Sequence, residues 1–406
     1  MIPNRKQEIK QYMTMLSILS LVAFLLNFQP KVRSYNTTML SLSYEYGFTS
    51  RSLLGTIYHI LDKIIPVDMM NYHAATVFAT VVTILFIGFL LFAAFGFLWY
   101  CSDDSVKLVE YLSMIVLLNV ITTYSYPYNL LRVDIFMIGV SLVGVLALVS
   151  GRAEWLVIPL SALGVMFHQG YVFMYFNLIL VLLFYQMLTV EGKRVKYAIY
   201  FGVSFALGSV LFLWFELFSR TNGDAIFDKV VSEATALSFD GIYHSTLLYH
   251  EVLGIDLAAS ETELMMINRV HFPIFIILIL PYIILFGRLF INVIKQADTK
   301  LLKFKYIIVA IGSDTMLPDF LMKVDYGRWV VSVIVYYFVI VLALIAMGDA
   351  YIKNEAIKIG AECKSKLWFI ILIIYPVLLY PFLDVDIDAF LRHFAGLIND
   401  TFLHWY

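Results

Sequence analysis

The sequence has little charge. Only 14% of its 406 residues are Asp, Glu, Lys or Arg, whereas 61% are hydrophobic and the mean hydropathy is +0.85. Soluble domains carry about 25% charged residues, so this chain has too few charges to cover a water-facing surface of its size. The scarcity excludes a soluble enzyme, a disordered chain and a nucleic-acid-binding protein. The net charge of −2 points to no particular partner.

Cysteine and the motifs of soluble enzymes are also scarce. The chain has two cysteines, Cys101 and Cys363, too few for a disulfide framework or a thiolate metal cluster. It contains no HExxH, P-loop, GxSxG or GxGxxG, the motifs that mark metalloproteases, nucleotide-binding proteins and hydrolases. We therefore expect no familiar soluble chemistry placed on a membrane scaffold.

Long apolar runs are what the sequence has in abundance. A helix needs roughly 20 mostly apolar residues to cross a bilayer, and eleven stretches approach that length. The sequence thus predicts an all-α, polytopic integral membrane protein with a single transmembrane domain over residues 1–406. The predicted spans are 13–29, 77–100, 108–126, 133–150, 153–168, 170–188, 197–217, 272–292, 306–322, 329–347 and 367–383.

Two of these spans are interrupted. The fifth carries Pro159 and ends at Phe167-His168-Gln169-Gly170, and the ninth carries Gly312 and Pro318. A bilayer tolerates irregular backbone only where protein buries it or where it lines a cavity. We therefore expect broken or re-entrant helices at both places.

Basic residues predict the orientation. With the N-terminus inside, the short inner segments hold 16 of the 28 Lys and Arg, and the much longer outer segments hold 11. Cytoplasmic loops are enriched in basic residues, so we expect a cytoplasmic N-terminus and an outer C-terminus. The outer segments are rich in Arg, whose planar fork binds phosphate in bidentate fashion. Interfacial snorkelling is the simpler explanation for any single outer Arg.

Two outer segments, 30–76 and 218–271, are long and rich in polar and aromatic residues. Loops of this length are usually functional or have structure of their own. We expect interfacial helices that roof a cavity on the outer face.

Charged residues at membrane depth are costly and usually functional. Asp319 precedes the tenth span, and Asp325-Tyr326-Gly327-Arg328-Trp329 opens it from outside. A simple ion pair between Asp325 and Arg328 that caps the helix start is the competing explanation.

A second candidate group opens the fourth span from outside. Arg132 and Asp134 follow a cluster of three tyrosines at 124–128. Aromatic faces beside an Arg suit a sugar phosphate, because sugar rings stack on aromatic rings while Arg holds the anion. An interfacial aromatic belt explains the tyrosines equally well.

Two more segments carry groups suited to proton transfer. His168 lies at the outer turn between the fifth and sixth spans, where a neutral imidazole could accept a proton from a sugar hydroxyl. Glu45 and Arg51 bracket a Gly-containing turn in the first outer loop. Glu45 is either a base, a metal ligand or a solvated side chain.

Three features follow one another along this part of the chain. They are an Arg at the outer start of a span, a short charged inner turn, and a span that ends in Phe-His. The residues are Arg132, Gly151-Arg152-Ala153-Glu154 and Phe167-His168-Gln169-Gly170. This arrangement resembles the EpsG-like and Wzy-type polysaccharide polymerases of bacteria over about residues 125–190. The resemblance implies a membrane glycosyltransferase that joins oligosaccharide repeat units carried on undecaprenyl pyrophosphate at the outer face.

In such a reaction an acceptor hydroxyl attacks the anomeric carbon of a sugar whose leaving group is a lipid pyrophosphate. Fixed Arg side chains would stabilise the charge that this leaving group gains. We expect Arg51, Arg132 and Arg328 in that role. His168 or Glu45 would assist the acceptor hydroxyl. The side chains expected to orient the arginines or bind sugar hydroxyls are Asp134, Asp319 and Asp325.

This interpretation requires no metal and no cofactor, because Arg replaces the metal as the charge partner. The expected partners are the lipid-linked oligosaccharide, membrane lipid and other polysaccharide-assembly proteins. Two alternatives stay open. One is a glycosyltransferase of the GT-C type, in which Glu45 would be the base or metal ligand. The other is a transporter, which would explain the interrupted helices equally well.

Overall fold

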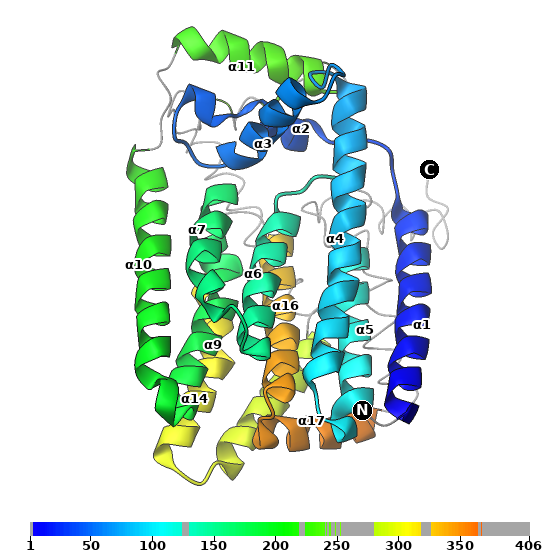
Figure 1. Ribbon diagram of the computed structural model, residues 1–406, viewed down its shortest axis with the longest axis vertical. Helices are drawn as coiled ribbons and strands as arrows, with labels where there is room; N and C mark the ends of the chain where they lie inside the picture. The colour runs from blue at the N-terminus through cyan, green and yellow to red at the C-terminus, as the bar shows by residue number, and fades with distance from the viewer. Residues whose placement is uncertain are drawn as a thin grey trace, which may run out of the picture.

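The computed structural model describes most of the chain as helices that run side by side in one bundle (Figure 1). Every regular element in the described residues is an α-helix or a 3₁₀-helix. The residues described are 3–123, 130–218, 224–239, 241, 243–244, 248, 252, 280–317, 326–363 and 367.

Four helices in this part of the chain are long and apolar enough to cross a membrane. They are α1 (Pro3–Asn27), α4 (Tyr72–Tyr100), α10 (Arg194–Phe218) and α16 (Tyr326–Ala346). In the most apolar stretch of α16, 83% of the residues are buried, whereas in that of α10 only 17% are. The helix α16 is therefore central in the bundle and α10 is peripheral (Figure 1). The predicted class, a helical membrane protein, agrees with these features.

Shorter helices fill the space between the long ones. They are α5 (Val106–Thr123), α6 (Asp134–Ser150), α7 (Val157–Phe167), α9 (Phe176–Thr189) and α14 (Lys300–Ile311). At 1.5 Å per residue, α6 is about 25 Å long and α7 about 17 Å, short of the roughly 30 Å of a bilayer core. The eleven spans and the re-entrant segments therefore stay predictions.

Both spans predicted to be interrupted contain a short 3₁₀ segment, although Pro159 itself lies within α7. The fifth predicted span is a 3₁₀ turn, η3 (Glu154–Leu156), followed by α7, which ends before His168. The ninth begins earlier than predicted, as α14, and tightens into a 3₁₀-helix, η6 (Gly312–Met316). Asn177 of α9 donates to the Gly312 carbonyl and to Thr315 Oγ1, both at 3.0 Å. A neighbouring helix thus satisfies part of the irregular backbone, as burial in a bilayer demands.

Three helices from the long outer segments lie across one end of the bundle (Figure 1). They are α2 (Ser34–Ser41), α3 (Ser52–Ile64) and α11 (Asp224–Leu237), and a 3₁₀ turn, η1 (Tyr44–Tyr46), joins the first two. We call this the outer end, because the sequence predicts that segments 30–76 and 218–271 lie outside. The helix α2 is buried in spite of its polar side chains, because they bond to neighbouring segments. Thr37 shares a hydrogen bond of 3.2 Å with Ser238, and Thr38 accepts one from the His244 amide.

Charged side chains tie the helices together at the opposite end, where α17 (Ala350–Cys363) lies across the bundle (Figure 1). Arg5 of α1 donates to the carbonyls of Leu98 and Cys101 at 2.9 and 2.7 Å, at the C-terminus of α4. A cation is favourable there because the last carbonyls of a helix have no partner within it. Lys353 of α17 pairs with Asp104 at 2.9 Å.

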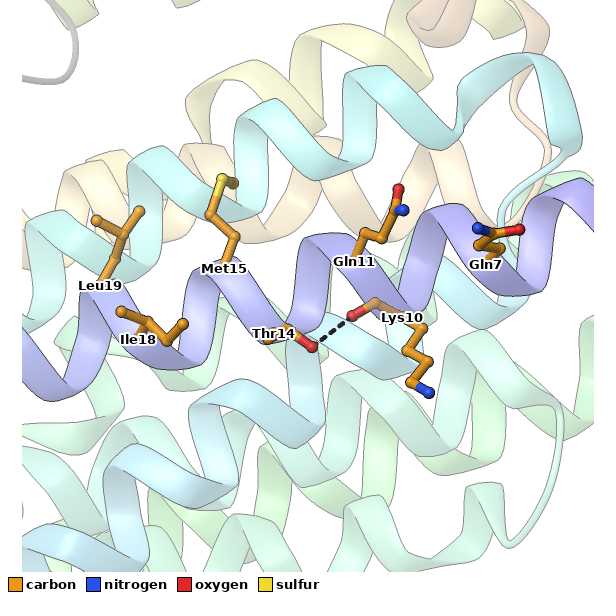
Figure 2. Close-up of a pocket in the computed structure, with 7 residues that line it drawn as sticks. All are labelled: Gln7, Lys10, Gln11, Thr14, Met15, Ile18 and Leu19. Carbon is orange, nitrogen blue, oxygen red and sulfur yellow. Dashed lines mark hydrogen bonds between the residues drawn. The ribbon is translucent and has the colours of Figure 1, made fainter.

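A shallow groove of about 550 Å³ runs along one face of α1 (Figure 2). The described residues that line it change from polar to apolar along the helix, and Thr14 donates to the Lys10 carbonyl within it. They are Gln7, Lys10, Gln11, Thr14, Met15, Ile18 and Leu19. A second cavity, of about 40 Å³, is lined by Ser113 of α5 and by apolar side chains from α4, α5, α6 and α16. Neither cavity includes a residue that the sequence singles out as functional.

Candidate functional site

Three predicted site residues meet at the start of α6. The Asp134 carboxylate is fully buried and lies 3.4 Å from Arg132 Nε through Oδ2 and 3.2 Å from Arg328 Nε through Oδ1. Both arginine side chains are nearly buried, at 12% and 8% exposure. Arg328 comes from α16, 194 residues along the chain. The cluster therefore joins two segments that the sequence does not connect.

The backbone beside this cluster is held in an uncommon conformation. Leu131 has φ of +65°, a left-handed geometry that costs a residue with a side chain roughly 1 kcal/mol or more. The side-chain amide of Asn36 in α2 donates to the Leu130 carbonyl at 2.8 Å in a buried position. The buried Leu130 and Leu131 side chains pack into a small apolar core at the outer end. These contacts hold the turn and so aim Arg132 at Asp134.

His168 follows the last residue of α7 and is 7% exposed. Its Nδ1 accepts a hydrogen bond from the Gly170 amide at 2.9 Å. Because a neutral imidazole carries one proton, the ring then has its proton on Nε2 and presents a donor there. Abstraction of a hydroxyl proton by Nε2 requires the other tautomer.

Glycine at position 170 allows this approach of the imidazole. A Cβ there would lie 2.9 Å from His168 Nδ1 and 3.1 Å from Cε1. Gly164 lies one helical turn before His168 and has a similar role. A Cβ at position 164 would lie within 2.6 Å of three atoms of the Tyr171 ring. Tyr171 in turn accepts a hydrogen bond from Ser141 of α6 at 2.9 Å. The His168 turn is thus packed firmly against α6.

Arg51 lies close to the same turn. The Ser50 hydroxyl donates to Gln169 Oε1, which joins the first outer loop to the residue after His168. Arg51 itself has φ of +64° at the N-cap of α3. Burial and the nearby Arg51 charge both lower the pKa of His244, so Arg51 also faces the second outer segment.

A pair of stacked rings connects the His168 turn to the Asp134 cluster. Phe167 and Phe136 stack with centroids 4.8 Å apart and planes 18° apart. Phe136 lies two residues after Asp134 on α6. The structure therefore places Arg51, Arg132, Asp134, His168 and Arg328 on adjoining segments at the outer end of the bundle.

Glu45 belongs to a different group of charges. It is 41% exposed, forms an ion pair with Lys63 and lies 3.9 Å from His59. The hydrogen bond from Lys63 lowers the pKa of the Glu45 carboxyl, against the opposing effect of desolvation. A carboxylate held charged by an ammonium is a weak base, so this geometry disfavours Glu45 as a proton acceptor.

Two predicted site residues, Asp319 and Asp325, lie outside the described residues. Among those that are described, no group of three His, Cys, Asp or Glu side chains is arranged to hold a metal ion. The cavity expected at the site stays a prediction.

The sequence did not lead us to predict His59, Glu233 or Asn36 as functional residues. Glu233 lies on α11 and accepts a hydrogen bond from Tyr46 at 2.9 Å. The missed signal was the pattern of α3, in which Ile57, Ile60 and Ile64 are exposed and His59 is buried. A polar residue on the buried side of an amphipathic helix needs a partner.

Comparison of the chain with protein-family models, with curated proteins and with solved structures finds no match. The argument for a function therefore rests on geometry. Two guanidinium groups share one carboxylate, so the three buried side chains carry a net charge of +1. Arg328 Nε donates a hydrogen bond to Asp134 Oδ1 at 3.2 Å, and Arg132 Nε forms an ion pair with Oδ2 at 3.4 Å. The Arg132–Asp134–Arg328 cluster can hold an anion, and the Asp134 carboxylate fixes the two guanidinium groups relative to each other.

Proposed function

We propose that this chain is a membrane glycosyltransferase that joins oligosaccharide repeat units carried on undecaprenyl pyrophosphate at the outer face of the bacterial plasma membrane. The observation that carries the proposal is the buried Arg132–Asp134–Arg328 cluster at the outer end. A pyrophosphate leaving group needs fixed positive charge in a site of low dielectric constant. The resemblance of residues 125–190 to the EpsG-like and Wzy-type polymerases supports the same reaction.

In this mechanism Arg132 and Arg328 bind the pyrophosphate oxygens, and the gain in charge as the glycosidic bond breaks strengthens that contact. Asp134 holds both guanidinium groups in place, so no arginine must reorganise during the reaction. Arg51, from the first outer loop, adds a third cation. His168, whose Nδ1 accepts a hydrogen bond from the Gly170 amide, assists the acceptor hydroxyl.

The two alternatives have less support. A GT-C-type enzyme would use Glu45 as a base or metal ligand, but Lys63 already engages that carboxylate. A transporter would account for the 3₁₀ segment η6, whose backbone Asn177 contacts. The Arg–Asp–Arg cluster would also suit the lipid-phosphate leaving group of a GT-C donor, so the Glu45–Lys63 pair is what distinguishes that alternative.

The test is incubation of the purified protein with labelled lipid-linked oligosaccharide. Chain elongation is expected; transfer of a single sugar would favour the GT-C alternative, and absence of any transfer would favour the transporter. Arg132→Lys and Arg328→Lys are expected to reduce elongation at least roughly tenfold, the loss of about 1.4 kcal/mol of transition-state stabilisation, because Lys keeps the charge but loses the planar fork.

The matched control is Arg194→Lys. Arg194 pairs with Glu191 at 3.5 Å in an exposed position, where ion pairs contribute roughly 0–1 kcal/mol, so elongation should not change. Product length and amount are read on gels at equal protein level. Normal elongation by both Arg132→Lys and Arg328→Lys would refute the pyrophosphate clamp.

A further inference from the structure

A second group of charges lies at the outer end, apart from the Asp134 cluster. His59 of α3 is 5% exposed and lies between two carboxylates. Its Nδ1 is 3.9 Å from Glu45 Oε2, in η1, and its Nε2 is 3.6 Å from Glu233 Oε2, in α11. One imidazole ring thus bridges an element on each side of α3.

The proton count of the ring makes this arrangement sensitive to pH. A neutral imidazole has one N–H and one lone pair, so in the neutral form one carboxylate always faces a lone pair. Only the imidazolium donates on both sides. Both distances exceed the 2.7–3.2 Å of an N–H···O hydrogen bond, and the buried Nε2 of His59 has no hydrogen-bond partner. Both carboxylates therefore lie beyond hydrogen-bonding distance of the ring.

Other groups hold the two carboxylates in place without His59. Lys63, also on α3, pairs with Glu45. Tyr46 donates to both oxygens of Glu233 at 2.9 and 3.1 Å. Lys229 of α11 lies 3.9 Å from Glu233 and 5.0 Å from the centre of the Tyr46 ring. These contacts keep the outer end assembled at neutral pH, so protonation of His59 adds to an interface that already exists.

The chemistry of the neighbours also fixes the direction of the effect. Lys63 keeps the Glu45 carboxyl charged as the pH falls, because it lowers the pKa of that group. Of the α3 neighbours in the described residues, α7 contributes no ionisable side chain. A proton that arrives at this interface therefore adds a buried positive charge between two negative ones.

We propose that His59 is a proton-operated latch that fastens α11 to η1 and α3 over the outer end of the bundle. In the protonated state both ring nitrogens donate, and Glu45 and Glu233 close on the ring. In the neutral state the α11 contact relaxes to the Tyr46 and Lys229 interactions. The latch senses the pH of the compartment that the outer end faces, and it does not depend on the reaction proposed above.

The experiment is hydrogen exchange of the full chain in lipid nanodiscs at about pH 5 and pH 8, the interval in which histidine changes charge. Each exchange rate is divided by the intrinsic rate at its own pH, so that only structural opening remains. Peptides from residues 224–237 are expected to be roughly tenfold more protected at the lower pH, equivalent to about 1.4 kcal/mol.

His59→Gln removes the titratable ring and should leave α11 equally protected at both pH values. His59→Asn is a second variant in case Gln disturbs the packing. The matched control is His73→Gln, since His73 is exposed on the neighbouring helix α4, and it should keep the full response. The proposal is overturned if wild-type α11 shows no change with pH, or if both His59 variants respond as wild type does.

Discussion

At the scale of single residues, the outer end depends on side chains that chemically similar residues could not replace. Asp134 is fully buried between two guanidinium groups, and removal of one member of a buried ion pair costs roughly 3–5 kcal/mol. Gly170 is needed because the His168 ring occupies the space of a Cβ. Residue identity here is set by contacts and charge, in a chain otherwise dominated by interchangeable apolar side chains.

Gly170→Ala tests the position of His168. The added methyl group would lie 2.9 Å from Nδ1, so the ring must move and lose the hydrogen bond from the residue 170 amide. We expect polymer elongation to fall at least roughly fivefold, which is about 1 kcal/mol, while the amount of inserted protein changes little. Gly192→Ala is the control, because nothing lies within 4 Å of a Cβ at that position. Equal activity of the two variants would show that the orientation of His168 is unimportant.

At the scale of elements, α17 is fixed at its N-terminus by one buried carboxylate. Asp349 Oδ1 accepts a hydrogen bond from the Ile352 amide at 2.9 Å, which caps the helix. Its Oδ2 accepts from Tyr185 of α9 and Tyr306 of α14, at 2.5 and 2.8 Å, and lies 3.8 Å from the buried Lys305 ammonium. This cluster joins three helices at the end of the bundle opposite the candidate site.

Asp349→Asn is expected to destabilise the protein by about 3–5 kcal/mol, because it leaves the Lys305 ammonium buried without an opposite charge. The measurement is thermal unfolding in detergent, followed by tryptophan fluorescence. The double variant Asp349→Asn with Lys305→Met removes both charges, and it should recover part of the lost stability. A double variant that is less stable than Asp349→Asn alone would mean that Lys305 contributes through its contacts with the Tyr185 and Tyr306 rings.

At the scale of the whole molecule, the two ends of the bundle differ in chemistry. The end with α2, α3 and α11 combines buried polar side chains with the Arg–Asp–Arg cluster. The opposite end is held by exposed ion pairs such as Arg5–Asp103 and Lys353–Asp104 and by the buried Asp349–Lys305 pair. Excess basic residues in the short loops of that second end predict that it faces the cytoplasm.

Orientation can be tested with single cysteines after Cys101 and Cys363 are replaced by Ser. Val67 follows α3 in the chain and is 61% exposed. The Val67→Cys variant should therefore react with a membrane-impermeant maleimide in spheroplasts. Lys193→Cys, exposed in the turn η4 (Glu191–Lys193) before α10, should react only after the membrane is opened. The reverse pattern would place the Asp134 cluster at the cytoplasmic face and contradict an outer-face polymerase.

The helical membrane class could be predicted from the sequence, because the low charge points to a membrane and long apolar runs mark helices. Helix ends were predicted less well. The helix at the ninth predicted span, 306–322, begins earlier, at Lys300. Hydropathy treats the charge of Lys305 as the end of the apolar run. In the structure the Tyr185 and Tyr306 rings cover that charge, so the helix includes it. Within the candidate site, the sequence singled out Arg132 and Asp134 as one group and Arg328 as part of another, without connecting the two.

The sequence by itself determined the helical membrane class and the residue types at the outer end, since these follow from local composition and from the cost of charge in a bilayer. Only the tertiary structure decided which charges meet. It paired Arg328 with Asp134 across 194 residues, placed Glu45 with Lys63 and His59, and set His59 against Glu233. Ion pairs between distant segments depend on how helices pack, and hydropathy carries no information about that packing.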